Sequence, residues 1–378
     1  MNETILFLDQ YGSKYGGAQQ ILIDIAEFLS EKSFKVSVAL PDNQELAQNL
    51  LSKSIEVRFF DNFIDTSKYP YKSNLFYHFF WSIIHAIKLK KKYKYDDIKI
   101  IYCNGGRTFA LGLFLSYFLN VNLIFHLHLV YNFNQRIYLN ILGRFSKLRR
   151  VIVVSEFLKL QYKNLNIYHK IEVVNNWSNF QFDENKIKFK KSDLNNYKII
   201  VVGRISDLKG QFHLLFCLRK IFFDFDLNIE FTFIGSCDDE KTKDKFNDII
   251  NTFENPFINV KYKGFIENVE DEISKYDFLL QPSLIYEAQS LAIIEAFTAK
   301  VIVISNNIFS NKDMIKHGVN GFIYESSIEE SLEILFKEIY QKKYDLNYII
   351  KNAYNDAKTL YCKQYQLKKI ASLIEDEV

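Results

Sequence analysis

Residues 281–306 read QPSLIYEAQSLAIIEAFTAKVIVISN, and the fold class can be predicted from this segment. The apolar run FLL at residues 278–280 precedes it and stops at the turn-forming QPS, which predicts a buried strand that ends in a turn. Helix-forming residues follow over 288–299, and VIVIS then predicts a second buried strand. A strand, a loop, a helix and a strand in this order pack as a right-handed parallel crossover, so the stretch predicts an α/β fold.

Two glutamates lie in this unit. Glu287 falls in the loop beyond the first strand and Glu295 about two turns down the helix, which separates them by roughly 12 Å along its axis. Ligands of open α/β sheets bind at that loop edge, and free amides at the helix start suit a phosphate. This span suits a sugar hydroxyl at one end and a ribose at the other, although glutamates flanking a helix turn are also common on a solvated face. The amides in question belong to Gln289, Ser290 and Leu291.

A second group of polar residues precedes this unit. In NNYKIIVVGRISDLKGQFHLL, residues 195–215, the strand KIIVVG ends at Gly203, Arg204 emerges at its carboxyl end, and Lys209 with Gly210 opens the next helix. A guanidinium and an ammonium at that edge can hold a diphosphate from two directions, although a loop arginine and lysine are often simply solvated. Further strands are predicted at 229–236, 260–265 and 277–283.

The first half of the chain reads as a separate domain. TILFLD, a glycine-containing loop, an amphipathic helix and FKVSVALP form a βαβ unit. Gly16 and Gly17 at the helix start allow a backbone to approach an anion, although a glycine pair can also just turn the chain. Strands at 55–60, 98–103, 123–128 and 150–155 complete a doubly wound domain over 1–180, followed by a polar linker over 181–196, a second domain over 197–350 and C-terminal helices over 351–378.

Bulk composition limits the possible functions. With 378 residues, 48% of them hydrophobic, the chain can bury the cores of two domains. A net charge of +3 is too small to indicate a nucleic-acid binder. The four cysteines form no C-x-x-C pair, which argues against a disulfide framework or a zinc site and for a reducing compartment. Met1 leads almost directly into a strand, so we expect no signal peptide.

Two segments raise the question of a membrane. No charged side chain lies between Arg107 and Arg136, but asparagines and histidines interrupt the second half, so we predict a helix to about Leu119, a turn at Asn120 and then a strand. Residues 69–95 include the helix NLFYHFFWSIIHAIKLKKKYKY, which joins an aromatic face to five lysines. Such a helix can lie on an anionic membrane surface, or can be an ordinary core-facing helix with a solvated lysine end.

The strings GRISDLKG and E-x7-E together resemble motifs of the retaining glycosyltransferases of family 4, which have the GT-B fold. The resemblance implies two Rossmann-like doubly wound domains facing a cleft, with the last helix crossing back onto the first domain. It implies transfer of a sugar from a UDP- or GDP-type nucleotide sugar, without a cofactor or metal, to a saccharide or polyprenyl-linked saccharide of bacterial surface polysaccharide. The location would be cytoplasmic, either free or peripheral at the inner membrane.

The resemblance also implies roles for individual residues. Arg204 and Lys209 would neutralise the leaving diphosphate, Glu287 would bind a hydroxyl of the donor sugar, and Glu295 would bind the ribose. The turn at Gly264 to Ile266 would receive the base, and Gly16 and Gly17 would face the diphosphate and the acceptor. The departures from the family that leave the shape of two turns open are Lys300, Ile302, Ser310 and Asn311.

Two histidines and one acidic string remain. His126 and His128 flank Leu127 at a predicted strand end, and we predict that they project to opposite sides. By resemblance one of them contacts the transferred sugar, with His128 the better fit and His126 the alternate. No third ligand is spaced nearby for a metal. The DFD string at 224–226 could be a metal-binding D-x-D, but it falls at the amino edge of the sheet, so we predict no metal site.

Two other functions share this fold. A nucleotide-sugar 2-epimerase would bind the same donor and isomerise it in the absence of an acceptor. A non-catalytic partner subunit would keep the fold and the donor site but transfer nothing, and the four departures from the family pattern motivate that alternative.

Overall fold

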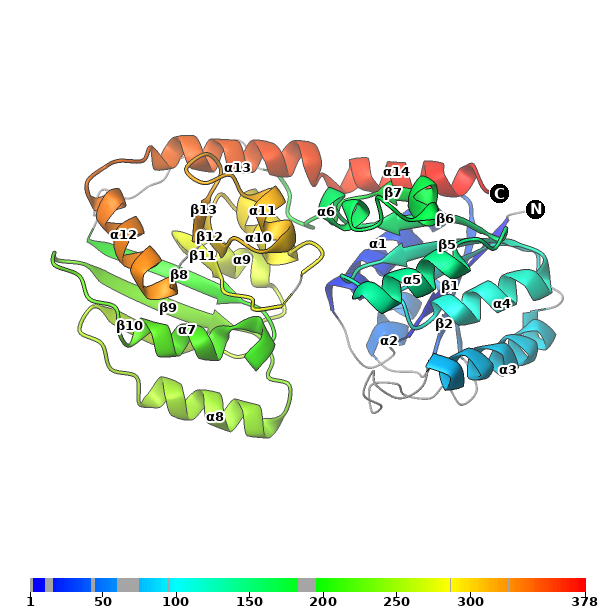
Figure 1. The fold of residues 1–378 in the computed structure, drawn as a ribbon, viewed down its shortest axis with the longest axis horizontal. Helices are drawn as coiled ribbons and strands as arrows, with labels where there is room; N and C mark the ends of the chain where they lie inside the picture. The colour runs from blue at the N-terminus through cyan, green and yellow to red at the C-terminus, as the bar shows by residue number, and fades with distance from the viewer. Residues whose placement is uncertain are drawn as a thin grey trace. The chain divides into compact units, whose positions relative to one another are not determined.

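The computed structural model describes residues 3–10, 16–41, 45–59, 75–93, 96–182, 195–285, 287–324 and 327–378. The chain forms two compact units, one of residues 1–175 with 364–378 and one of residues 176–363. Each unit contains one parallel sheet flanked by helices (Figure 1). The first unit gives way to the second after residue 175, slightly before the domain boundary at residue 180 that the sequence predicted. The inferred linker at 181–196 lies mostly outside the described residues.

The sheet of the first unit has seven strands in the order β3-β2-β1-β4-β5-β6-β7, all pairs parallel. The order reverses between β1 and β4, and ligands of open α/β sheets generally bind at the carboxyl ends of the strands beside such a reversal. The strands are β1 Thr4–Asp9, β2 Lys35–Leu40, β3 Glu56–Phe59, β4 Ile98–Asn104, β5 Asn122–Leu127, β6 Leu148–Val153 and β7 Ile171–Val173.

Local signals fix several helices of the first unit. Asn120 ends α4 in the left-handed conformation with φ 59°, so the prediction of a helix to Leu119 followed by a turn and a strand is confirmed. Asn132 and Gln135 form a capping box at the start of α5. The helices are α1 Gly17–Glu31, α2 Glu45–Ser52, α3 Leu75–Tyr93, α4 Phe109–Leu119, α5 Phe133–Leu142, α6 Glu156–Leu160, the 3₁₀ helix Asn166–Lys170 and α14 Lys363–Glu375.

Most of the C-terminal helix α14 belongs to the first unit, although it follows the second unit in sequence. Just beyond it, Glu377 accepts hydrogen bonds from Arg149 Nε at 2.8 Å and Arg150 Nε at 2.9 Å. Lys32 of the first unit pairs with Glu375 at 3.2 Å. These ion pairs fasten the C-terminal end of the chain to the first unit.

The sheet of the second unit has six parallel strands in the order β10-β9-β8-β11-β12-β13, with its reversal between β8 and β11. The strands are β8 Asn196–Val202, β9 Asn228–Ile234, β10 Ile258–Tyr262, β11 Phe278–Gln281, β12 Ile302–Asn306 and β13 Phe322–Tyr324. The helices are the 3₁₀ helix Asp207–Lys209, α7 Gln211–Leu218, α8 Glu240–Asn251, α9 Val269–Ile273, α10 Leu291–Thr298, α11 Phe309–Met314, α12 Ile328–Tyr340 and α13 Leu346–Leu360.

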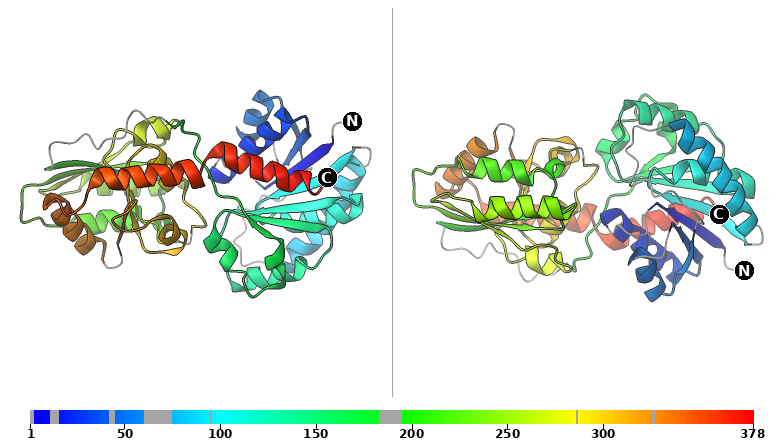
Figure 2. Two further views of the ribbon diagram at one scale, coloured as in Figure 1. Left: turned by 90° about the horizontal axis from the view of Figure 1, so that it is seen from above. Right: turned by 90° about the horizontal axis from the view of Figure 1, so that it is seen from below.

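Both faces of this second sheet are covered, as Figures 1 and 2 show. Successive strand residues point to opposite faces, so Ile199 and Val201 join one buried cluster and Ile200 joins the other. Helices α7, α8 and α12 close the first cluster, and α9 and α10 close the second. The apolar runs of the sequence are therefore explained by burial on both sides. Within the described ranges, no helix is long and apolar enough to cross a membrane.

Candidate functional site

The two motif strings of the second unit meet at the carboxyl ends of β8 and β11. Leu284 N donates to Leu208 O at 3.0 Å, which joins the loop after β8 to the turn after β11. Gly210 lies in the left-handed region with φ 79°, and a Cβ there would sit 2.1 Å from the carbonyl oxygen of Pro282. Only glycine allows this approach, so Gly210 is what lets Lys209 lie beside the glutamate loop.

Lys209 and Glu287 form the centre of this edge. Lys209 Nζ donates to Glu287 Oε1, and both side chains are largely withdrawn from solvent. The same carboxylate oxygen accepts from Ser283 Oγ at 2.6 Å and from Gln281 Nε2 at 3.1 Å. Three donors therefore hold Glu287 in one orientation as a carboxylate. The structure brings together the predicted cation and the predicted acid, which lie 78 positions apart in the chain.

Arg204 has a different partner. Its Nε lies 3.2 Å from Asp238 Oδ1, and its side chain is 54% exposed, so it contacts neither predicted glutamate. Asp238 follows β9 in the neighbouring loop, and no sequence motif marks it as a partner of Arg204. An exposed ion pair of this kind is weak, which leaves Arg204 able to exchange its partner for another anion.

Helix α10 begins later than predicted. The expected start at residue 288 is wrong, because the helix begins at Leu291 with Ser290 as its N-cap. Gln289 is buried in the bend that precedes the helix, where its Oε1 accepts from Asn176 N at 2.6 Å and its backbone oxygen accepts from Asn176 Nδ2 at 3.3 Å. The side chain of Gln289 therefore fastens the loop, and the free amides of the helix start belong to the residues after it.

Glu295 lies inside α10, and its side-chain carboxyl has no hydrogen-bond partner among the described residues. Burial, and secondarily the charge of Glu270, raises the pKa of Glu295 to about 7. A half-buried carboxyl without a partner is costly unless a ligand supplies one, and such groups concentrate at functional sites.

The predicted base-binding turn follows β10. Gly264 there has φ 73° and open space around its Cα, and Phe265 is 71% exposed. Ile266 is partly buried against the cluster that includes α10. The turn therefore presents backbone and one aromatic ring to solvent while its third residue anchors it.

In the first unit, Gly16 caps α1 and Gly17 begins it. Gly16 has an extended backbone with φ −150°, a conformation open to any residue, so strain does not explain the glycine. The carbonyl of Gly16 accepts from Gln19 N and Gln20 N, both at 3.0 Å. Residues 11–15 of the preceding loop lie outside the described residues.

The prediction that His126 and His128 project to opposite sides is wrong. Residues two apart in a strand share a face, and the two rings lie against each other with centroids 3.9 Å apart and planes tilted by 37°. His126 is 1% exposed and its Nδ1 lies 2.8 Å from Tyr102 Oη, whereas His128 is only half-buried. Burial lowers the pKa of His128 to about 4. Of the two, His128 is the one that a ligand can reach.

Two residues beside His128 were missed from the sequence. Asp9 ends β1 and Asn104 ends β4, and the two are paired across the strands and buried. Asn104 Oδ1 lies 2.8 Å from His128 Nε2, and Asn104 Nδ2 lies 2.6 Å from Asp9 Oδ2. A polar residue at the carboxyl end of each strand beside the sheet reversal was the signal that could have found them.

Comparison with known proteins agrees with this geometry. Residues 182–356 match the family model of glycosyl transferases group 1, and residues 15–181 match that of glycosyltransferase family 4. The chain belongs to the group 1 glycosyltransferases. The resemblance to glycosyltransferases inferred from the two motif strings is therefore confirmed, and the retaining mechanism stays a prediction.

Relatives of this glycosyltransferase carry related descriptions. A Staphylococcus aureus protein, the capsular polysaccharide biosynthesis glycosyltransferase CapH, is 28% identical over 338 residues, which cover 84% of each chain. HepE of Anabaena, solved in complex with UDP, is 22% identical with a TM-score of 0.77 and covers 99% of this chain and 100% of its own. The lipopolysaccharide outer core galactosyltransferase WaaB, in its apo form, is 15% identical with a TM-score of 0.72 over 99% and 100%. These structures share the GT-B fold.

The departures from the family pattern are built into the glycosyltransferase site. Ser310 Oγ donates to the backbone oxygen of Glu287 at 2.8 Å. Asn311 Nδ2 donates to Ser305 Oγ at 2.9 Å, and both residues are buried. Lys300 takes the left-handed conformation with φ 63° and places its ammonium over the ring of Tyr354. Ser310 therefore supports the loop that carries Glu287, whereas Asn311 contacts the end of β12 and Lys300 contacts α13.

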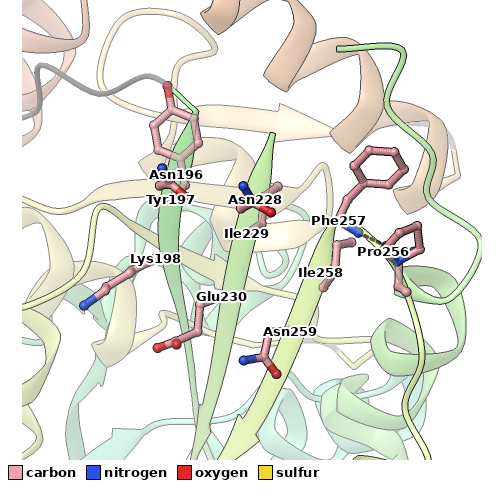
Figure 3. Close-up of a pocket in the computed structure, with 11 residues that line it drawn as sticks. Asn196, Tyr197, Lys198, Asn228, Ile229, Glu230, Pro256, Phe257, Ile258 and Asn259 are labelled. Carbon is pink, nitrogen blue, oxygen red and sulfur yellow. Dashed lines mark hydrogen bonds between the residues drawn. The ribbon is translucent and has the colours of Figure 1, made fainter. Parts of the chain in front are cut away.

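The acidic string at 224–226 is bound to structural partners. Asp224 pairs with Lys337 at 3.1 Å, and Asp226 accepts from Asn195 at 3.4 Å. Across the described ranges, no group of three histidine, cysteine, aspartate or glutamate side chains is arranged to hold a metal ion. A hollow at the amino ends of β8, β9 and β10, lined among others by Lys198 and Glu230 (Figure 3), lies at the edge of the sheet opposite to Glu287.

Proposed function

We propose that this glycosyltransferase is a retaining enzyme that moves a sugar from a UDP-type nucleotide sugar to a saccharide or lipid-linked saccharide acceptor in surface polysaccharide assembly. The observation that carries the proposal is the contact between Lys209 and Glu287 beside the start of α10. The capsular description of CapH supports the biological process, and the complex of HepE with UDP-glucose supports the donor class.

The chemistry needs positive charge where the diphosphate leaves. Breaking the bond at the anomeric carbon places negative charge on the departing phosphate, and preorganised donors stabilise that charge in the transition state. Lys209, the exposed guanidinium of Arg204 and the backbone amides at the start of α10 supply such donors. We infer that this protein-derived charge serves in place of a metal ion.

The two glutamates take separate parts in this proposal. Glu287 is held as a carboxylate by three donors, so it can accept a hydrogen bond from a sugar hydroxyl and orient the donor. Glu295, which has no protein partner in the described ranges, would accept from the ribose hydroxyls. We assign no side-chain base, because in a retaining transfer of this type the leaving phosphate accepts the proton of the acceptor.

A thermal-shift screen of nucleotide sugars, followed by a transfer assay, tests the function. A ligand that binds only the folded state adds about 2.7 kcal/mol to the free energy of unfolding when its concentration is 100 times its dissociation constant. The melting temperature rises as a result. We expect UDP-sugars to raise it more than UDP alone, and sugar to appear on a saccharide acceptor. An epimer formed from the donor alone would instead identify an epimerase, and binding without turnover would identify a non-catalytic partner.

The position of α3 supports a place at a membrane surface. On one side this helix buries Trp81, His85 and Leu89, and on the opposite side it exposes Phe80, Ile84 and Ile87 by 45–62%. Lys88 and Lys91 are exposed along the same side. The helix is thus both core-facing and basic, so the two interpretations from the sequence are compatible. An apolar stripe edged by lysines suits the headgroup region of an anionic bilayer.

Vesicle sedimentation tests this placement. We expect binding to vesicles with 30% anionic lipid at low salt, weaker binding at high salt, and little binding to zwitterionic vesicles. Exchanging both Lys88 and Lys91 for glutamine should abolish most of the binding. The matched control exchanges Lys351 and Lys368, which are exposed on other helices, and should leave it intact. Equal losses in the two variants would contradict the proposal.

A further inference from the structure

The orientation of one buried amide determines how His128 can act. Asn104 is 2% exposed, and its Nδ2 lies 2.6 Å from Asp9 Oδ2 and 3.3 Å from the backbone oxygen of Ala18. Both neighbours are acceptors, and the two amide hydrogens of Asn104 satisfy them. Turning the amide over would place its oxygen against two other oxygens. The carbonyl side of Asn104 is therefore fixed toward His128.

This orientation fixes the proton on the imidazole. Asn104 Oδ1 lies 2.8 Å from His128 Nε2, and an amide oxygen can only accept, so Nε2 must carry the hydrogen. The ring is neutral because burial lowers the pKa of His128 to about 4. Nδ1 then holds a lone pair, and the structure gives this atom no hydrogen-bond partner in the described ranges.

We propose that Asn104, held by Asp9, is a positioning residue that fixes His128 as the Nε2-protonated tautomer and presents its Nδ1 as a hydrogen-bond acceptor to a substrate hydroxyl. The role at the substrate rests on the proposed sugar transfer. The assignment of the tautomer rests on the geometry of the first unit.

The surroundings hold the ring and the amide in place. Gln19 Nε2 lies 3.4 Å from each oxygen of Asp9, so the network continues to the first turn of α1. On the other side, the ring of His126 packs against the ring of His128, and Tyr102 Oη lies 2.8 Å from His126 Nδ1. Residues of β1, β4, β5 and α1 thus combine to leave one ring nitrogen available.

The tautomer selects a class of ligand group. A neutral Nδ1 acceptor attracts the hydrogen of a hydroxyl and repels a phosphate or carboxylate oxygen. His128 is therefore suited to a hydroxyl of a sugar and unsuited to neutralise the diphosphate or to act as an acid near neutral pH. This separates its task from that of Lys209 in the other unit.

NMR of the full chain labelled with ¹⁵N-histidine tests the assignment at pH 7.5. The protein has seven histidines, and the signal of His128 is identified by its loss in His128→Gln. We expect Nε2 to be protonated, Nδ1 to be unprotonated, and the Nε2 proton to be visible because a buried hydrogen bond slows its exchange with water. A proton on Nδ1, or a doubly protonated ring, overturns the proposal.

Two variants test the role of the amide. Asn104→Leu removes the acceptor, so the Nε2 proton signal should disappear through exchange, while the signals of exposed His169 stay unchanged. Asp9→Asn keeps an oxygen for Asn104 Nδ2 and should retain the signal. Retention of the protected proton in Asn104→Leu overturns the positioning role. The parent spectrum alone decides the tautomer if the leucine variant does not fold, and no nucleotide sugar enters the measurement, so failure of the sugar-transfer proposal is a separate result.

Discussion

Replacement of Glu295 by glutamine should stabilise the second unit at alkaline pH while weakening nucleotide binding. The pKa of Glu295 stands at about 7 against an ordinary value of 4.5. Each pKa unit corresponds to about 1.4 kcal/mol, so the ionised side chain costs up to about 3 kcal/mol at pH 8. Because Glu295 keeps some exposure to solvent, we expect a gain of about 1–3 kcal/mol from Glu295→Gln.

The sign of the pH dependence follows from proton binding. Between pH 4.5 and pH 7 the folded chain holds a proton on Glu295 that the unfolded chain has lost, so stability falls as pH rises through this window. The glutamine variant does not titrate there. The stability of Glu295→Gln should therefore exceed that of the parent by a margin that grows from pH 5 to pH 8.

Urea unfolding followed by tryptophan fluorescence measures this margin. The chain has two tryptophans, and Trp177 is buried in the second unit, so a Trp81→Phe background leaves a probe for that unit. Glu272→Gln is the opposite control, because hydrogen bonds from Lys263 and Lys275 lower the pKa of Glu272 to about 2. Removing that carboxylate should destabilise the unit at pH 8. A margin for Glu295→Gln that is negative at pH 8, or constant with pH, would refute the reasoning.

Three further predictions follow from the same contacts. Lys209→Met should lower the transfer rate by about 100-fold in a radiolabelled-donor assay, whereas Lys241→Met on the exposed side of α8 should not, and equal rates in both variants would contradict the role of Lys209. In Gly210→Ala the new Cβ would lie 2.1 Å from the Pro282 carbonyl oxygen, so the free energy of unfolding in urea should fall by about 1–3 kcal/mol. An unchanged urea midpoint would contradict this prediction. Burial lowers the pKa of His128 from 6.5 to about 4, so its neutral form stabilises the first unit above pH 6.5 and this contribution is lost as pH falls toward 4. In His128→Gln, the free energy of unfolding of the first unit, followed by the fluorescence of Trp81, should therefore fall less steeply between pH 6.5 and pH 4. An unchanged slope would contradict this prediction.

The sequence was sufficient for most of the strands and for the edge of the second sheet at which Lys209 and Glu287 meet. Apolar runs buried on both faces, each followed by glycine or a polar residue, mark the carboxyl ends of parallel strands. That pattern located Lys209 and Glu287 at one edge before any contact was known. It could not show that Arg204 pairs with Asp238, because the pairing depends on how two exposed loops lie.

Helix boundaries and side-chain networks were beyond the sequence. The start of α10 was misplaced because residues 288–290 have adequate helix propensity, but Asn176 holds Gln289 in a bend outside the helix. That bond joins positions 113 residues apart, and local propensity does not detect it. The histidine pair was misjudged for a different reason, since the two-residue period of a strand, correctly applied, places His126 and His128 on one face.

Topology alone could have indicated both sites without a family resemblance. In each unit the strand order reverses once, between β1 and β4 in the first and between β8 and β11 in the second. Asp9 and Asn104 end the first pair of strands, while Gly203 follows β8 and Gln281 ends β11. The side chains and loops at these four strand ends hold His128 in the first unit and Lys209 with Glu287 in the second. At such a reversal the two neighbouring crossover connections run to opposite sides, so no helix covers the strand ends between them. Polar side chains there can bind a ligand without being buried in the hydrophobic core.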